Sequence, residues 1–335
     1  MHYQCSIYGL GLVANRTIPG VPTSSISAVD VRISFGFLPA WLNELSSTQI
    51  ESSYIADFKD ALGNPALRVF KVLGGKYYRF SYADRTEFLI DQAGREIWAI
   101  WPETLALEDT ATYLLGPVMG FVLLLRGLVC LHASAIAVGD EAIALLGPAG
   151  AGKSTTAAAF SARGHSILAE DVVTLDDRGN YFLVRPAYPC IRLWPASVEA
   201  LYGADTQLPK LTPNWDKCYL DLTQNPEQFQ TTPLPLAAIY QLTERRDVPT
   251  APFIQSINRT DGLISLIANT YATKLMDKEM RAREFELLGR VLAHVPLRRV
   301  TPHTSPARIP ELCESILEDF ESWSAQEKPG HAFHV

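Results

Sequence analysis

The chain has 335 residues, of which 47% are hydrophobic and 19% charged, an ordinary balance for a globular protein long enough for two domains. Its net charge of −7 argues against a nucleic-acid binder, because affinity for a phosphate backbone comes from clustered Lys and Arg side chains. The five cysteines are scattered, without Cys-x-x-Cys spacing. We therefore expect no disulfide framework or zinc site, and a reducing cytoplasm as the location.

Residues 1–108 show the alternating pattern of β-strands. Two-residue or short Gly-containing turns at Gly74-Gly75 and at 92–94 predict hairpins between neighbouring strands. The strands are expected at 29–35, 67–72, 76–82, 87–90 and 96–100. The sequence thus predicts a small antiparallel β-rich domain, which has no catalytic constellation and which we expect to contribute to recognition of a partner.

An apolar helix is predicted at 105–125, with a kink at Pro117 and an end at Gly127. The apolar stretch 118–138 is long enough to suggest a membrane span, but Arg126 interrupts it near its centre at a cost of about 2.5–3.5 kcal/mol. We therefore expect a buried helix followed by a buried strand, and no membrane partner. The first residues also lack the charged start and apolar block of a signal peptide.

The strongest motif follows an apolar strand predicted at 141–146 and matches G-x-x-x-x-G-K-[ST]. It reads Gly147, Pro148, Ala149, Gly150, Ala151, Gly152, Lys153, Ser154 and Thr155, and a helix follows. The glycines let backbone N–H groups close around phosphate oxygens at a helix N-terminus. Lys153 would reach the β- and γ-phosphates and Ser154 would offer its hydroxyl to Mg²⁺. The motif predicts ATP and Mg²⁺ as cofactors.

Two acidic residues, Glu170 and Asp171, follow a short strand predicted at 166–169. One helix and one return strand separate them from the loop, which places them beside the phosphate site. Neighbouring strand residues normally point to opposite faces, although a bulge at the strand end could turn both inward. His132 lies within the strand predicted at 129–138, next to the strand that feeds the loop.

The remaining pattern extends the second domain to residue 325. Strands are predicted at 181–184, 190–194, 236–242 and 297–300, and helices at 197–202, 262–275, 280–292 and 310–324. The sequence therefore predicts an α/β fold in which a catalytic domain at 109–325, a mixed sheet with flanking helices, follows the β-rich domain. A flexible tail is expected at 326–335.

The run from His132 through the Gly147–Ser154 loop, Arg163-Gly164-His165 and Ala169-Glu170-Asp171 resembles the P-loop catalytic domain of the HPr kinase/phosphorylase family. The lead-in 112–117, the segment Arg192-Leu193-Trp194-Pro195 and the β-rich N-terminal region are more similar to HPr-kinase-related serine kinases. Those kinases occur among genes for peptide natural products and include lasso-peptide precursor kinases.

This resemblance implies a kinase that phosphorylates a serine of a peptide or protein, with a lasso precursor as one such substrate. It implies that Glu170 accepts the hydroxyl proton, that His132 supports this carboxylate, and that Ser154 and Asp171 hold Mg²⁺. Arg192 and Lys217 are candidates for holding the acceptor or the γ-phosphate, with a surface role as the alternative. The sequence leaves open whether the chain forms a homo-oligomer.

The chain departs from the family in two respects. Glu170 stands where the family usually has Asp, and no Asn- and Arg-rich C-terminal motif is found, which argues against phosphorolysis and against HPr as the substrate. Two other functions remain open. A small-molecule kinase would usually have helices and an Arg-bearing lid in place of the strands at 181–194, and a nucleotide-gated scaffold would keep the loop but lose the base.

Overall fold

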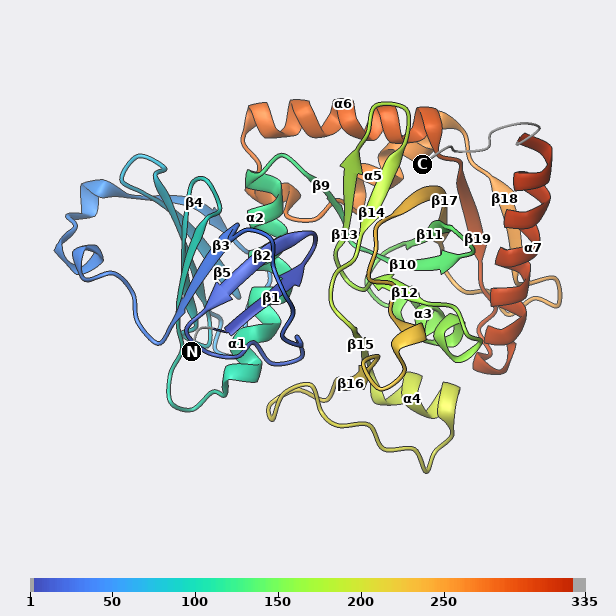
Figure 1. The fold of residues 1–335 in the computed structure, drawn as a ribbon, viewed down its shortest axis with the longest axis horizontal. Helices are drawn as coiled ribbons and strands as arrows, with labels where there is room; N and C mark the ends of the chain where they lie inside the picture. Colours follow the sequence, from blue (N-terminus) through green and yellow to red (C-terminus); the bar gives the residue numbers. More distant parts are fainter. Residues whose placement is uncertain (1–2, 328–335) are drawn as a thin grey trace.

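The computed structural model describes residues 3–327. Figure 1 shows two β-structured regions with a long helix between them, and further helices around the second region. Of the tail predicted at 326–335, only its first two residues lie within the described part, where they end helix α7. The largest cluster of buried apolar side chains contains residues from both regions and from the helix, so the two regions share one core.

The N-terminal region is an eight-stranded sheet with the strand order β1-β2-β3-β8-β7-β6-β5-β4. Both predicted hairpins are present, as β5–β6 and β7–β8. The sheet is mixed, however, and not antiparallel throughout, because β3 runs parallel to both β2 and β8. A long loop between β2 and β3 makes the parallel pairing with β2 geometrically accessible. The strands are β1 (Tyr3–Ile7), β2 (Leu10–Ala14), β3 (Val31–Phe35), β4 (Ile50–Ile55), β5 (Leu67–Val72), β6 (Tyr77–Tyr82), β7 (Glu87–Asp91) and β8 (Glu96–Ile100).

The connecting helix has three parts: α1 (Leu107–Tyr113), a π-helical turn (Leu114–Val118) and α2 (Met119–Leu125). The turn contains Pro117, which has no backbone N–H and so favours such an irregularity. By length and composition Leu107–Leu125 could cross a membrane, but 78% of its most apolar window is buried inside the structure. The helix is thus a core element, as predicted.

The second region is a nine-stranded sheet with the central order β12-β10-β11-β17-β14-β13-β9, extended by β19 on β17 and β18 on β19. A separate pair, β15–β16, lies beside it. Its strands are β9 (Val129–Leu131), β10 (Ala133–Val138), β11 (Glu141–Leu146), β12 (Ile167–Ala169), β13 (Val173–Asp177), β14 (Phe182–Arg185), β15 (Cys190–Leu193), β16 (Cys218–Asp221), β17 (Leu234–Leu242), β18 (Phe253–Ser256) and β19 (Leu297–Thr301). Its helices are α3 (Lys153–Ala162), α4 (Pro195–Tyr202), α5 (Arg259–Ala268), α6 (Lys278–His294) and α7 (Ile309–Glu327).

The strand predicted at 129–138 is interrupted at His132. Its first part, β9, pairs with β13, whereas its second part, β10, pairs with β12. The return segment is interrupted at the same level, between β12 and β13, where Glu170 and Asp171 lie. The prediction of one continuous strand was therefore wrong. The two facing interruptions create the gap in which the polar residues meet.

The strand β12 runs parallel to β11, because both are antiparallel to β10, which lies between them. The carboxyl ends of parallel strands lie at the same edge of a sheet. This topology brings the loop after β11 and the acidic pair after β12 to one edge.

Helix α6 carries a buried acid, Glu284, that is 7% exposed and whose Oε1 has no hydrogen-bond partner. Burial raises the pKa of Glu284 to about 7, although a hydrogen bond with Thr270 lowers it by less. In the unfolded chain the pKa of a Glu carboxyl is about 4.3. The contribution of Glu284 to the free energy of unfolding is therefore fully present below that pH and is lost as the pH rises through 7.

We expect Glu284→Gln to increase the free energy of unfolding by about 1–3 kcal/mol more at pH 8 than at pH 5, because the amide carries no charge. Urea denaturation at the two pH values measures this difference. The exposed Glu286→Gln, on the same helix, is the control and should show no such pH dependence. An equal effect of Glu284→Gln at both pH values would contradict the prediction.

Candidate functional site

The loop between β11 and α3 has the backbone geometry of a phosphate-binding loop. Gly147 and Gly152 have positive φ values of 148° and 105°. A Cβ at Gly147 would lie 2.6 Å from the carbonyl oxygen of Leu242, and one at Gly152 would lie 2.9 Å from Nη2 of Arg245. These positions therefore require glycine, and the loop leads directly into the N-terminus of α3, where backbone N–H groups are free to bind an anion.

Lys153 is the first residue of α3 and is only 7% exposed. Its Nζ donates hydrogen bonds to the carbonyl oxygens of Gly147 (2.7 Å) and Pro148 (3.1 Å). Burial lowers the pKa of Lys153, whereas the nearby carboxylates of Asp171 and Glu170 raise it. The ammonium thus lies over the loop, where an anion would meet it.

Ser154 donates a hydrogen bond of 2.6 Å from its hydroxyl to Oε1 of Glu170. Glu170 is buried, at 5% exposure, and its other oxygen, Oε2, lies 3.3 Å from Nε of Arg192. A hydroxyl and a carboxylate at hydrogen-bond distance are the kind of hard oxygen ligands that Mg²⁺ prefers. The sequence paired Ser154 with Asp171, and the structure pairs it with Glu170 instead.

Asp171 follows with a positive φ of 71°, and this left-handed backbone turns its side chain toward the same gap as that of Glu170. His132, at the facing interruption, places Nδ1 at 3.1 Å from Oδ1 and 3.2 Å from the backbone oxygen of Asp171. A proton on Nδ1 satisfies both oxygens. The strand ends before the acidic pair, and the left-handed residue Asp171 turns the chain there. His132 supports Asp171 and not Glu170.

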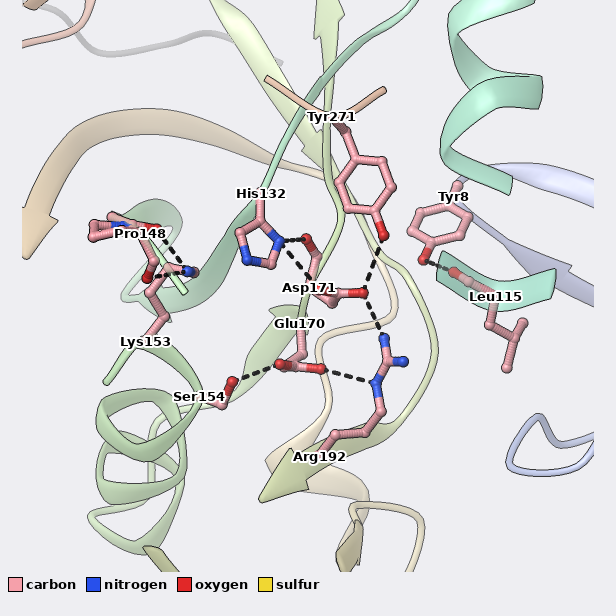
Figure 2. A network of polar contacts seen from close by, with 11 residues as sticks. Tyr8, Leu115, His132, Pro148, Lys153, Ser154, Glu170, Asp171, Arg192 and Tyr271 are labelled. Carbon is pink, nitrogen blue, oxygen red and sulfur yellow. Dashed lines mark hydrogen bonds and ion pairs between the residues drawn. The ribbon is translucent and has the colours of Figure 1, made fainter. Parts of the chain in front are cut away.

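Arg192, on β15, joins the two acids (Figure 2). Its Nη2 lies 2.8 Å from Oδ2 of Asp171, and its Nε contacts Glu170. Burial alone would raise the pKa of Asp171, but the Arg192 guanidinium and His132 hold it well below its usual range. Burial would lower the pKa of Arg192, but Tyr188 and the two carboxylates hold it well above its usual range. Asp171 and Arg192 are therefore both ionised at neutral pH.

Lys217, the second cation that the sequence singled out, lies 5.3 Å from the ring centroid of Trp194. Its charge is close enough to contribute to the lowered pKa of both Asp171 and Lys153. Lys217 thus adds positive potential to the site without a direct contact with the acids, whereas Arg192 makes that contact.

Tyr271 is a site residue that the sequence did not indicate. Its hydroxyl lies 3.4 Å from Oδ2 of Asp171, and its ring packs against the connecting helix. A Cβ at Gly120 would lie only 2.4 Å from that ring, and one at Gly116 would lie 3.3 Å from Oδ2 of Asp171. Glycines four residues apart in an apolar helix signal a close approach of a partner on that face, but nothing in the sequence identifies the partner as Tyr271.

A cavity of about 150 Å³ adjoins the loop on the side of α4 and the segment before α7. Gly152 and Thr155 line it on the loop side, and Arg245 and His303 line it on the other. The Thr155 hydroxyl lies 2.8 Å from that of Ser197, which ties α3 to α4. A nucleoside attached to phosphates on the loop would meet this cavity.

The structure thus brings together Lys153, Ser154, Glu170, Asp171 and His132, which the sequence had named from three separate segments. Within residues 3–327, no group of three or more His, Cys, Asp or Glu side chains is arranged to hold a metal ion. Mg²⁺ bound together with phosphates typically takes only one or two protein carboxylates and keeps several waters.

We expect Gly120→Ala to reduce the free energy of unfolding by about 1–3 kcal/mol, because the added methyl group overlaps the Tyr271 ring. Gly289→Ala is the matched control, since Gly289 also lies within a helix but nothing lies within 4 Å of its added Cβ. The free energy of unfolding of this control should increase by about 0.5–1 kcal/mol, because Ala has a higher helix propensity than Gly. Denaturant unfolding of both variants measures these changes, and a gain in both would contradict the close packing at Gly120.

No protein-family model matches the chain, and no curated protein matches it. Among solved structures, the Hpr(Ser) kinase/phosphatase from Coxiella burnetii is similar to 58% of this chain, over 98% of its own length. The sequence identity is 13% and the TM-score is 0.34.

Proposed function

We propose that the protein is an ATP-dependent kinase that transfers a phosphoryl group to a serine hydroxyl of a peptide or protein. The observation that carries the proposal is the chain of contacts from Ser154 through Glu170 and Arg192 to Asp171 and His132, directly beside a glycine-rich loop. A loop alone supports nucleotide binding, whereas two carboxylates with different partners support chemistry at that nucleotide. Serine as the acceptor, and a lasso precursor as one example, follow from the sequence resemblance.

The residues present suit a bound Mg²⁺·nucleotide. The loop N–H groups and Lys153 would hold the phosphates, while Ser154 and Glu170 would hold the metal. The bound ion supplies charge neutralisation on the transferred group, which is the largest part of catalysis for a loose phosphoryl-transfer transition state. Arg245 and the other groups around the adjoining cavity would contact the nucleoside.

Asp171 is the better candidate for the carboxylate that receives the proton of the acceptor hydroxyl. It has no contact with Ser154, and His132 fixes its orientation through Oδ1. This assignment exchanges the roles that the sequence gave to Glu170 and Asp171. Arg192 contacts both carboxylates, and its guanidinium remains beside them as the proton moves to Asp171.

The first test measures phosphoryl transfer from ATP to serine-containing peptides. Mass spectrometry detects the transfer as the mass of one phosphoryl group added to the peptide. We expect Lys153→Ala to reduce the rate by about 10²–10³-fold, because it removes a cation from the developing charge. Retention of the full rate would remove the assigned site. Transfer to free metabolites alone would favour a small-molecule kinase, and nucleotide binding without transfer would favour a scaffold.

Glu170→Gln and Asp171→Asn distinguish the two roles. Loss of a metal ligand weakens Mg²⁺ binding, so the rate of Glu170→Gln should recover in part as Mg²⁺ is raised. Loss of the proton acceptor should reduce kcat of Asp171→Asn by about 10²–10⁴-fold at every Mg²⁺ concentration. Each substitution also removes a charged partner of Arg192. Thermal unfolding of both variants shows whether a loss of rate comes from a loss of stability. Recovery of Asp171→Asn and not of Glu170→Gln would restore the roles expected from the sequence.

A further inference from the structure

A second cavity, of about 380 Å³, lies between the N-terminal region and the second sheet. The loop after β2 and helix α1 with its π-helical turn form one wall, and β15, β16 and the segment before β16 form the other. Its apolar lining comes from both sides and consists of Pro19, Ala111, Leu115, Tyr188, Leu211 and Tyr219. Neither the loop that binds phosphate nor the nucleoside cavity contributes to it.

Arg192 connects this cavity to the carboxylates. It lines the cavity, and its guanidinium contacts both Glu170 and Asp171. On the opposite wall Leu115 is followed by Gly116, where a Cβ would lie 3.3 Å from Oδ2 of Asp171. The cavity therefore adjoins the acidic pair from both sides.

The cavity lies on the side of the acidic pair that faces away from the nucleotide. Ser154 contacts Oε1 of Glu170, whereas Arg192 contacts the other oxygen, Oε2. Figure 2 shows Leu115 and Arg192 on the side of the carboxylates away from Ser154 and Lys153. In phosphoryl transfer the attacking and leaving oxygens lie roughly in line, so an acceptor must approach from the side opposite the nucleotide.

The chemistry of the lining favours an apolar occupant. The charge of Arg192 is matched by the two carboxylates. The other two charged residues of the lining, Glu108 and Lys210, are both exposed, and Lys210 pairs with Asp216. Tyr219 lies opposite Arg192 in the β15–β16 ladder, so its ring and the Arg192 stem form one continuous surface. Apart from Arg192, the buried residues of the lining carry no charge, so a charged metabolite would meet no free counter-charge among them, whereas an apolar side chain would gain burial.

We propose that this cavity binds an apolar or aromatic residue next to the acceptor serine of a peptide substrate. The inference rests on the proposed kinase function and specifies its substrate class. An extended peptide advances about 3.3–3.6 Å per residue, so one or two residues cover the length of the Arg192 side chain. With the serine at Asp171, the side chain of an adjacent residue enters the cavity. Both walls of the cavity then contact the substrate. Pro19 and helix α1 provide these contacts on the side of the N-terminal region.

The test uses blocked hexapeptides with one serine among glycines and one variable residue immediately before or after it: Phe, Leu, Gly or Asp. We expect kcat/KM to be about ten- to a hundredfold higher for Phe or Leu than for Gly or Asp in one of the two positions, the range that a buried apolar contact supports. Equal rates for all residues in both positions would overturn the inference and leave the kinase function intact. Transfer to none of the peptides would overturn both.

Leu211→Trp fills the cavity from a partly exposed position outside the acidic cluster. We expect this variant to lose the preference for Phe and Leu, while its affinity for ATP stays unchanged. Gln207→Trp is the matched control, because it adds an exposed indole to the same loop without lining the cavity. A preference unchanged in Leu211→Trp would contradict the proposed location, as would an equal loss of preference in both variants.

Discussion

The ion pairing of Arg192 with Glu170 and Asp171 is the interaction on which the rest of the site depends. Two adjacent carboxylates in a buried gap repel each other, and one would take up a proton unless a cation were shared between them. Arg192 supplies that charge in a planar geometry with separate donors for each acid. Removing one partner of such a buried cluster typically costs about 3–5 kcal/mol, because the others are left without compensation. The cluster is therefore a constraint on folding as well as the centre of the candidate site.

The position of this cluster follows from the two facing interruptions in the sheet. If the chain had continued as regular strands, Glu170 and Asp171 would point to opposite faces and His132 would be engaged in strand pairing. The interruptions instead free three polar side chains at the level where the glycine-rich loop ends. Tyr271 and the helix with Gly116 and Gly120 close this gap from the other side. The polar residues are therefore surrounded by packed side chains.

Much of this arrangement could be predicted from the sequence, because its signals are local. The strand, loop and helix around Lys153 were predicted correctly, as were the hairpins at Gly74-Gly75 and at 92–94 and the irregularity at Pro117. A glycine pattern, a two-residue turn and a proline each act through the backbone of their own segment.

The parts that could not be predicted depend on distant segments. The break at His132 appears only because β9 and β10 pair with different strands, and the apolar run through this position carries no sign of it. The contacts of the two acids depend on distant segments in the same way. The sequence resemblance placed His132 beside Glu170, whereas His132 contacts Asp171 and Arg192 contacts both acids. The parallel placement of β3 likewise depends on β8, which lies more than sixty residues further along the chain.

The connecting helix has a consequence for how such a chain can change during evolution. Phe121 packs on Tyr78 and Phe80 of the N-terminal sheet, while Gly120, one position earlier, packs on Tyr271 beside the acids. Consider a recombination at residue 108 that joined this N-terminal region to a different second region. The new connecting helix would keep its fit to the second region that it came with, but it would not match the N-terminal sheet. We therefore expect the helix to be inherited together with both of its neighbours, so that such chains change by point substitution at these contacts and not by exchange of whole domains.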